Sequence, residues 1–337
     1  MLPLVERKNL AQDLATPPEL LELLASAENW AVHDEVAQNT ATPPRVLVRL
    51  AEKGDANVRF LVAQNPSTPQ ETLDTLAVDK QTYVQSAVAK NPNTAISSLA
   101  QLAKHTYWEV RKAVAENPST SQETLSDLVD DGESKVRWLV VSHSNTQKEM
   151  LTTLSQDKDP NVRERVAQSL KTPPQVLARL AKDGDLGIRE RVAQNPNTSL
   201  QILELLASDC DPDVRMTVAE NPNTSLEVLT KLINDNYAYV TYAVALHPRT
   251  PKNVAQTIYT SLAQQDEVNE YFATRIVQKN ILEQTEVVAL IAVYGQKVAK
   301  AVADNISVEQ NSLLARVLTK YDCSLNQAEK TATIART

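Results

Sequence analysis

An arginine recurs at one fixed position of a 26-residue period along much of the chain. A guanidinium group is planar and binds a carboxylate or a phosphate through two parallel hydrogen bonds. Five of the six arginines also have an acidic residue four positions earlier, as Asp159 precedes Arg163. The row predicts either a structural ladder, in which each guanidinium binds capping carboxylates of its own or the next repeat, or a line of donors for an anionic ligand. Its members are Arg59, Arg111, Arg137, Arg163, Arg189 and Arg215.

Aromatic residues gather around the same position. In the first nine repeats all of them lie between four residues before the arginine position and one residue after it. They either fill the loops between repeats and pack over neighbouring helix ends, or form a recognition stripe, since Trp, Tyr and Arg dominate the energetics of protein interfaces. These residues are Trp30, Phe60, Tyr83, Tyr107, Trp108, Trp138, Tyr237, Tyr239 and Tyr242.

Further basic residues accompany the row between positions 109 and 215. Arg165 and Arg191 stand where other repeats often have Ala or Leu, so they either extend past the core or mark an anionic-ligand site. Basic residues beside aromatic ones are also typical of nucleic-acid surfaces. Acidic residues interleave with them and should neutralise much of the field, namely Glu109, Glu133, Asp159, Glu164, Glu190 and Asp213.

The candidate binding residues combine these rows. They are expected to hold a partner protein or peptide, with nucleic acid as the alternative partner. The set is Arg59, Phe60, Tyr83, Trp108, Arg111, Arg137, Trp138, Arg163, Arg165, Arg189, Arg191, Arg215, Tyr239 and Tyr242.

Residues for catalysis or metal binding are few. The chain has only four histidines, two cysteines and five glycines. These numbers leave few residues for histidine acid–base sites, four-ligand metal sites and glycine-rich phosphate-binding loops. His143 and His247 replace an asparagine of the repeat and are expected to act as that asparagine does. His33 and His105 have no partner at catalytic spacing. The sequence predicts no enzyme, no catalytic residue and no metal site.

A strict repeat must position these rows. Valine opens a unit every 26 residues from Val36 to Val244, Leu10 extends the series backwards, and a slip of six residues precedes two further units at Ile276 and Val302. A period of this length indicates a solenoid, in which each unit buries its apolar face only against its neighbours. We number the columns of each unit from this valine, so that the arginine row is column 24.

Each unit carries two helix signals. Thr fills column 7 in ten successive units and is often followed three residues later by Glu or Gln, which predicts an N-terminal capping box for a helix over columns 8–17, such as residues 69–78. An acid at column 20 predicts the N-cap of a second helix, which Asn-Pro at columns 4 and 5 ends. The asparagines of column 4 should satisfy turn amides from unit to unit.

The segment VRFLVAQNPSTPQETLDTLAVD, residues 58–79, resembles the leucine-rich repeat variant family, a relative of HEAT-like repeats. The resemblance covers residues 10–253 well and implies an all-α, right-handed superhelix of α- and 3₁₀-helical segments with no sheet. Some members bind an iron–sulfur cluster through N-terminal cysteines, but residues 1–35 contain none, so no cofactor is expected. HEAT-like DNA glycosylases use a related solenoid, which makes nucleic acid a concrete alternative.

The departures from the period predict the domain boundaries. Residues 1–253 form a ten-unit solenoid with repeats starting at 10, 36, 62, 88, 114, 140, 166, 192, 218 and 244, and residues 254–275 form an insertion. Residues 276–325 form two divergent capping repeats, a candidate dimerisation surface, and residues 326–337 a mobile tail.

The bulk composition points to a soluble chain in a reducing compartment. The formal net charge is −8, the start lacks the apolar core of a signal peptide, and the apolar run at 287–294 is too short to cross a bilayer. We therefore expect a cytoplasmic, non-enzymatic scaffold whose oligomeric state the sequence does not define.

Overall fold

The computed structural model describes residues 2–26 and 30–264, together with positions 287, 288, 291, 299, 300, 302, 303, 317, 318 and 320. Twenty α-helices and no strand occur within this part of the chain, which confirms the predicted all-α helical repeat fold. The predicted capping repeats at 276–325 and tail at 326–337 lie outside the described residues, apart from those single positions. The handedness of the superhelix stays a prediction.

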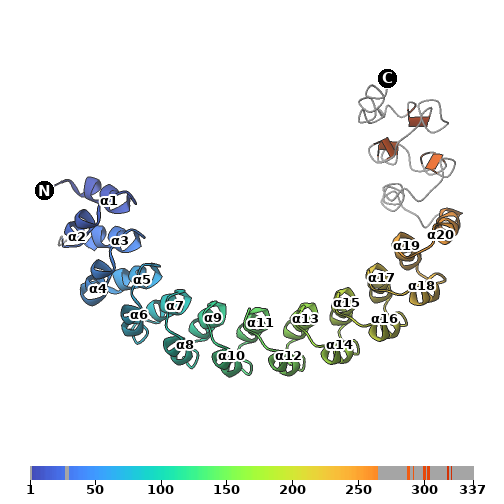
Figure 1. Ribbon diagram of the computed structural model, residues 1–337, viewed down its shortest axis with the longest axis horizontal. Helices are drawn as coiled ribbons and strands as arrows, with labels where there is room; N and C mark the ends of the chain where they lie inside the picture. Colours follow the sequence, from blue (N-terminus) through green and yellow to red (C-terminus); the bar gives the residue numbers. More distant parts are fainter. Residues whose placement is uncertain are drawn as a thin grey trace, which may run out of the picture. The chain divides into compact units, whose positions relative to one another are not determined.

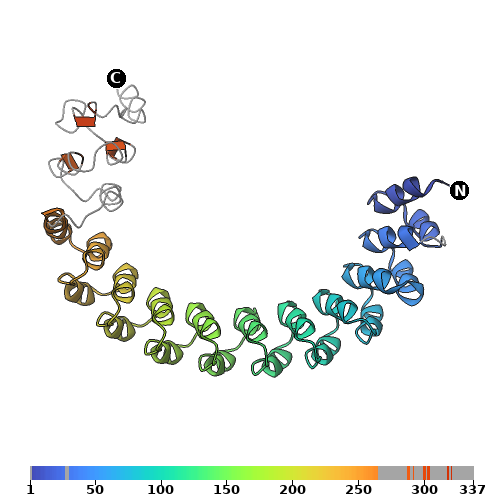
Figure 2. The ribbon, with the colours of Figure 1, turned by 180° about the vertical axis from the view of Figure 1, so that it is seen from behind.

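The chain divides into two compact units, Met1–Val176 and Leu177–Thr337. Within each unit the odd-numbered helices stand in one row and the even-numbered helices in a second row beside it (Figures 1 and 2). The odd row comprises α1 Leu4–Gln12, α3 Trp30–Gln38, α5 Ala56–Gln64, α7 Thr82–Lys90, α9 Trp108–Glu116, α11 Ser134–Ser142, α13 Pro160–Gln168, α15 Leu186–Gln194, α17 Pro212–Glu220 and α19 Ala238–Leu246. The even row comprises α2 Pro18–Ala25, α4 Pro44–Lys53, α6 Gln70–Leu76, α8 Ile96–Leu102, α10 Gln122–Leu128, α12 Lys148–Leu154, α14 Pro174–Leu180, α16 Leu200–Leu206, α18 Leu226–Leu232 and α20 Lys252–Gln264.

The core follows the predicted columns. In α6, Leu73 and Leu76 are buried one turn apart, and in α5, Val58 and Val62 are buried four residues apart. Both helices of each described repeat are α-helices, so the 3₁₀ segments that the resemblance implied are not found in this part of the chain. Hydrogen bonds between residues three apart occur at helix ends and turns, as where the Leu20 N–H donates to Pro17 O.

The predicted capping box at column 7 is wrong. The residue after each threonine has an extended backbone and takes the N-cap position, as Pro69 does with ψ of 147° before α6. The Thr68 hydroxyl instead donates to Val62 O at 2.5 Å, and Thr120 donates in the same way to Val114 O at 2.6 Å. Threonine therefore satisfies a carbonyl at the end of the preceding odd helix, where four carbonyls lack helical partners.

The asparagines of column 4 join consecutive repeats, as predicted. The Asn117 amide donates to Ala89 O at 2.7 Å and to Asn91 O at 2.9 Å, while its side-chain oxygen accepts the Ser119 N–H at 2.8 Å. Asn39, Asn65, Asn91 and Asn221 make the same three contacts in their own repeats. One side chain thus closes a turn and holds the carbonyls of the previous repeat.

Helix α20 departs from the even row. It has 13 residues, where α6, α8 and α10 have seven each, and it runs across the domain boundary expected after residue 253. The remainder of the predicted insertion, from residue 265 to 275, lies outside the described residues.

Candidate binding surface

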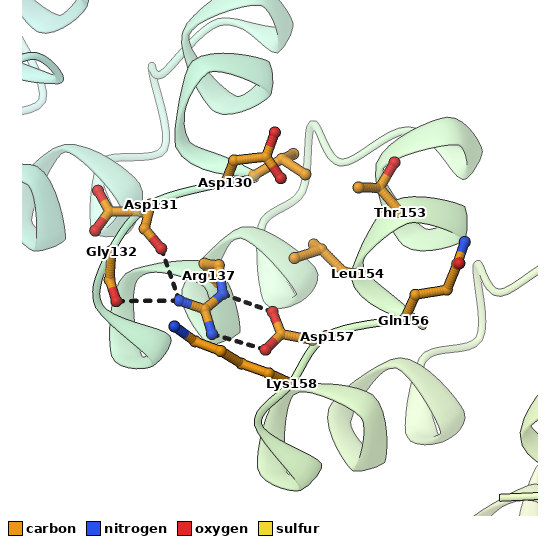
Figure 3. Close-up of a pocket in the computed structure, with 10 residues that line it drawn as sticks. Asp130, Asp131, Gly132, Arg137, Thr153, Leu154, Gln156, Asp157 and Lys158 are labelled. Atoms are coloured by element: carbon orange, nitrogen blue, oxygen red, sulfur yellow. Dashed lines mark hydrogen bonds and ion pairs between the residues drawn. The ribbon is translucent and has the colours of Figure 1, made fainter.

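The arginine row forms a ladder of ion pairs with aspartates of the next repeat. Arg137 on α11 is 5% exposed, and its Nε and Nη2 donate to the two carboxylate oxygens of Asp157 at 2.5 and 2.7 Å (Figure 3). Its Nη1 donates to the carbonyl oxygens of Asp131 at 2.6 Å and Gly132 at 3.3 Å. This guanidinium therefore closes the loop that precedes its own helix and binds the loop that follows α12.

The same bidentate geometry recurs along both units. It is seen for Arg59 with Asp79, Arg111 with Asp131, Arg189 with Asp209, and Arg215 with Asp235. Arg163 Nη1 donates to the backbone oxygen of Asp157 at 2.8 Å, just as Arg137 Nη1 donates to that of Asp131; each acceptor lies six residues before its arginine. The ladder interpretation of the row is confirmed.

The acids four residues before the arginines are N-caps, as predicted, but the carboxylates of the ladder pairs are others. Asp55 accepts the backbone N–H groups of Asn57 and Val58, and Asp159 accepts that of Asn161, so both are N-caps of odd helices. In each of the five pairs above, the carboxylate lies twenty residues after its arginine, as Asp79 does for Arg59. These ladder aspartates were absent from the candidate set.

Four of the ladder carboxylates, those of Asp79, Asp131, Asp209 and Asp235, are held in the ionised form. Burial raises the pKa of Asp131, but hydrogen bonds from the Arg111 guanidinium and the Glu133 backbone N–H outweigh it, so the pKa lies below its ordinary value. The pKa values of Asp79, Asp209 and Asp235 are lowered against burial in the same way. The contacts of these four carboxylates are therefore charge-assisted hydrogen bonds at neutral pH.

A cleft of about 430 Å³ opens beside the Arg137 pair. Figure 3 shows Asp130, Thr153, Gln156 and Lys158 around it, with the ladder pair forming one wall. Because the guanidinium already binds a carboxylate and two carbonyls, it is occupied as a donor within the fold. The Arg137 side of the cleft therefore presents few unoccupied donors to a ligand.

The aromatic side chains pair across neighbouring odd helices. The rings of Phe60 on α5 and Tyr83 on α7 meet edge to face with centroids 5.6 Å apart. Lys135 Nζ lies 5.3 Å from the centre of the Trp108 ring, and the Arg165 guanidinium lies 4.6 Å from the centre of the Trp138 ring. We call the surface formed by Phe60, Tyr83, Trp108, Lys135, Trp138 and Arg165 on α5 to α13 the aromatic surface.

This surface is open to solvent. Trp138 is 37% exposed and Tyr83 is 46% exposed, although both lie on helices that pack on each side. Arg165 is held over Trp138 by a hydrogen bond from its Nε to the Ser142 hydroxyl at 2.7 Å. The Arg165 side chain therefore extends past the core to the surface, which was one of the two interpretations of this residue from the sequence.

The remaining candidates lie in the second unit. Tyr237 and Tyr239 have ring centroids 5.7 Å apart, and the Arg215 guanidinium lies 5.5 Å from the centre of the Tyr237 ring. Arg191 donates to Gln194 Oε1 at 3.1 Å. Tyr242 is only 5% exposed and packs against the buried Tyr259, so it belongs to the core of this unit rather than to its surface.

Two histidines replace the asparagine of the turn, as predicted. In His247, Nδ1 accepts the Arg249 N–H at 3.1 Å while Nε2 lies 3.1 Å from Asn221 O. These contacts require a neutral ring with its proton on Nε2. Burial is the main cause that lowers the pKa of His247, the nearby Arg249 charge acts in the same direction, and the hydrogen bond to Asn221 O opposes them.

Acid is therefore expected to weaken the His247 turn. Because the folded pKa is depressed below the 6.5 of a free imidazole, its contribution to stability is present above pH 6.5 and is lost as pH falls through the folded pKa. Hydrogen exchange of α18 and α19 at pH 7.5, 6.5 and 5.5 measures this loss. The variant His247→Asn restores the side chain of the other repeats and should remove the pH dependence; equal pH dependence in both proteins would contradict this assignment.

The helical rows and the ion-pair and asparagine ladders define a helical-repeat solenoid protein. The leucine-rich repeat variant model matches residues 56–81 and 108–133, two repeats that contain Arg59 and Arg111. A solved structure described as a leucine-rich repeat variant with a novel repetitive structural motif is 26% identical, covers 66% of this chain and 87% of its own, and superposes with a TM-score of 0.53. The resemblance to leucine-rich repeat variant proteins is thus confirmed.

Other solved structures match with lower TM-scores. One is the Pds5–Scc1 complex, which is 12% identical, covers 94% of this chain and 64% of its own, and has a TM-score of 0.33. Another is a designed armadillo repeat protein in complex with the peptide (KR)4, which is 15% identical, covers 75% and 99%, and has a TM-score of 0.18. No curated protein matches the chain.

Neither a membrane-crossing helix nor a metal cluster is found in the part of the chain that the structure describes. No helix there has the length and hydropathy needed to span a bilayer. No three His, Cys, Asp or Glu side chains there converge on one point.

Proposed function

We propose that this chain is a non-enzymatic repeat scaffold that binds a partner protein or peptide along its aromatic surface. The observation that carries the proposal is the exposure of Trp138, 37% of which is open to solvent beneath the guanidinium of Arg165. Tryptophan and arginine are the residues most enriched among those that dominate binding energy. Solenoids acquire ligands through residues that vary from repeat to repeat on a constant scaffold.

The structural role of the other columns supports this choice of surface. Threonine, asparagine and the column-24 arginine are used within the fold, as in Thr120, Asn117 and Arg137. The columns that carry Phe60, Trp108 and Trp138 hold other residue types in most repeats. The repeat therefore leaves these columns available for recognition.

Nucleic acid remains the alternative partner, and no specific observation favours it. Its phosphates would need the arginine row, and five of those arginines already bind aspartates in the described residues. Outside the row, Lys112 on α9 forms an ion pair with Glu116 of the same helix at 3.3 Å.

Capture from native lysate tests the proposal. The variant with Trp108→Ala and Trp138→Ala is expected to lose a protein band that the tagged wild-type chain retains after nuclease treatment. Its melting temperature should change by only a few degrees, because both rings lie outside the aliphatic core. The matched control is Ile96→Ala, which shortens a side chain that is 58% exposed on the even helix α8 and should leave the band in place.

Two results would contradict the proposal. One is a band of equal strength with the double tryptophan variant and the wild-type chain. The other is a wild-type signal that disappears on nuclease treatment, which would transfer the function to nucleic-acid binding.

A further inference from the structure

Two cations on the aromatic surface differ from the arginines of the ladder. Lys135 and Arg165 form no ion pair with any described residue, whereas Arg137 between them in sequence binds Asp157. Both are positioned by a tryptophan of the preceding odd helix instead of by a carboxylate. A fixed cation without an anion in the fold is available to an anionic group from outside.

The two cations lie on consecutive odd helices. Trp108 begins α9, Lys135 and Trp138 are one turn apart on α11, and Arg165 lies on α13. Helix α11 packs against α9 and against α13, so the order Trp108, Lys135, Trp138, Arg165 crosses three neighbouring helices. We call these four residues the tryptophan–cation line.

The guanidinium of Arg165 is oriented but only partly used. Its Nε donates to the Ser142 hydroxyl at 2.7 Å, which fixes the plane over Trp138. Its other contact in the described residues is long, 3.5 Å from Nη1 to Gln168 Oε1. The Nη groups can therefore donate to a carboxylate while the stacking with the indole remains.

We propose that the tryptophan–cation line binds an acidic linear peptide in extended conformation, with two carboxylates about three residues apart. Neighbouring helix axes are about 8–10 Å apart, and an extended chain advances about 3.3 Å per residue, so carboxylates at positions i and i+3 match adjacent helices. This inference rests on the proposed function and names the chemistry of its partner.

Charge complementarity favours a peptide over a nucleic acid at this line. A nucleic acid carries a phosphate on every nucleotide and would also approach Glu109, which follows Trp108 in the first turn of α9. A peptide with two separate carboxylates avoids Glu109 and still reaches Lys135 and Arg165. Stacking of bases is also hindered, because a cation already covers one face of each indole.

Fluorescence anisotropy with the full chain and labelled 12-residue peptides tests the inference. The peptides share a Gly/Ser background and carry either two glutamates separated by one to six positions, two lysines, or no charge. The i, i+3 glutamate peptide is expected to bind tightest. Arg165→Gln and Lys135→Met should each weaken it by about tenfold or more, because each removes a charge-assisted contact.

Matched variants separate this line from general charge. Lys104→Met removes an exposed lysine that follows the even helix α8 and should leave the affinity unchanged. Arg165→Glu should reverse the preference towards the lysine peptide. Thermal unfolding followed by circular dichroism checks that every variant is folded.

Three results would overturn the inference: equal affinity for the acidic and uncharged peptides, unchanged affinity in Arg165→Gln, or tighter binding of a single-stranded oligonucleotide than of any acidic peptide. The proposed function can fail separately. A lysate protein that is captured through Trp108 and Trp138 while acidic peptides do not bind removes only this inference. Failure to capture any protein through the two tryptophans removes the proposed function itself.

Discussion

Replacement of Arg137 by methionine is expected to lower the free energy of unfolding by about 3–5 kcal/mol. The side chain is 5% exposed, and its loss leaves the Asp157 carboxylate, also 5% exposed at its side chain, without its counter-charge. The carbonyls of Asp131 and Gly132 lose their donor in the same step. A buried charge without a partner costs far more than the pair contributes. Denaturant unfolding and hydrogen exchange of α11 to α13 measure the effect.

Two further variants isolate the cause. Arg137→Met combined with Asp157→Asn removes both charges, keeps an acceptor for the Asp159 N–H, and should recover at least half of the lost stability. Arg45→Met breaks an ion pair with Glu22 of nearly the same length, 2.8 Å, but at a side chain that is 64% exposed, and should cost less than about 1 kcal/mol. Equal losses in Arg137→Met and Arg45→Met would show that the ladder does not stabilise the fold.

The repeat made most of the fold predictable from sequence. Each repeat packs its buried columns against the same columns of its neighbours, so the pattern recurs in each unit, as Val58 of one repeat and Val84 of the next show. The aspartates before the odd helices could be predicted as N-caps because capping depends only on backbone N–H groups two or three residues later. Asp55 and Asp159 confirm this prediction. Local signals of this kind need no knowledge of the neighbouring repeats.

The role of threonine was predicted wrongly because two local roles share one pattern. Thr68 followed by Glu71 satisfies the capping-box spacing, yet the hydroxyl donates backwards to Val62 O. Proline after the threonine has a fixed φ and suits either N-cap or N1. The deciding factor is that the carbonyl of Val62, at the end of the preceding helix, needs a hydrogen-bond donor. Whether the Thr68 hydroxyl can reach it depends on how tightly the Asn-Pro turn brings Val62 and Thr68 together.

The partners of the arginines were missed although the sequence contains a signal for them. Every arginine of the row is followed twenty residues later by aspartate, whereas Gln85 at the same column is followed by His105. In the structure Gln85 donates to Asp79 O and makes no contact with a carboxylate, consistent with this substitution. A comparison between columns of successive repeats would have found the pair, because the contact joins neighbouring units rather than neighbours in sequence.

From the sequence, the aromatic surface could be predicted only as a set of aromatic and basic residues at neighbouring columns, without the contacts between their side chains. Sequence columns place Trp138 and Arg165 on similar sides of successive helices, but the stacking of one on the other depends on side-chain torsions that the Ser142 hydroxyl fixes. The same columns placed Tyr242 with the others, and it is buried because Tyr259 on α20 covers it. The exposure of an aromatic side chain at this column thus depends on whether a residue of the next helix covers it.

Substitution of Asn117 by alanine is expected to destabilise the repeat around α9 by about 2–4 kcal/mol. Asn117 is fully buried, and its loss removes the amide donor to Ala89 O and Asn91 O and the acceptor for the Ser119 N–H. Water cannot replace these contacts easily in a site of this burial, so each orphaned group contributes to the loss. Hydrogen exchange of α7 and α9 should accelerate together, because the side chain joins their repeats.

Two other substitutions at this position distinguish hydrogen bonding from packing. Asn117→Asp keeps the shape but has no N–H to donate, so it is expected to be at least as damaging as alanine. Asn117→His should recover most of the stability at pH 7.5, because His143 already bonds to Asn117 O at 2.9 Å and accepts the Asn145 N–H one repeat later. Wild-type stability in Asn117→Asp would show that volume alone matters. If Asn117→His is much more stable than Asn117→Asp, as expected, the position requires a side chain that holds a donor and an acceptor in one plane.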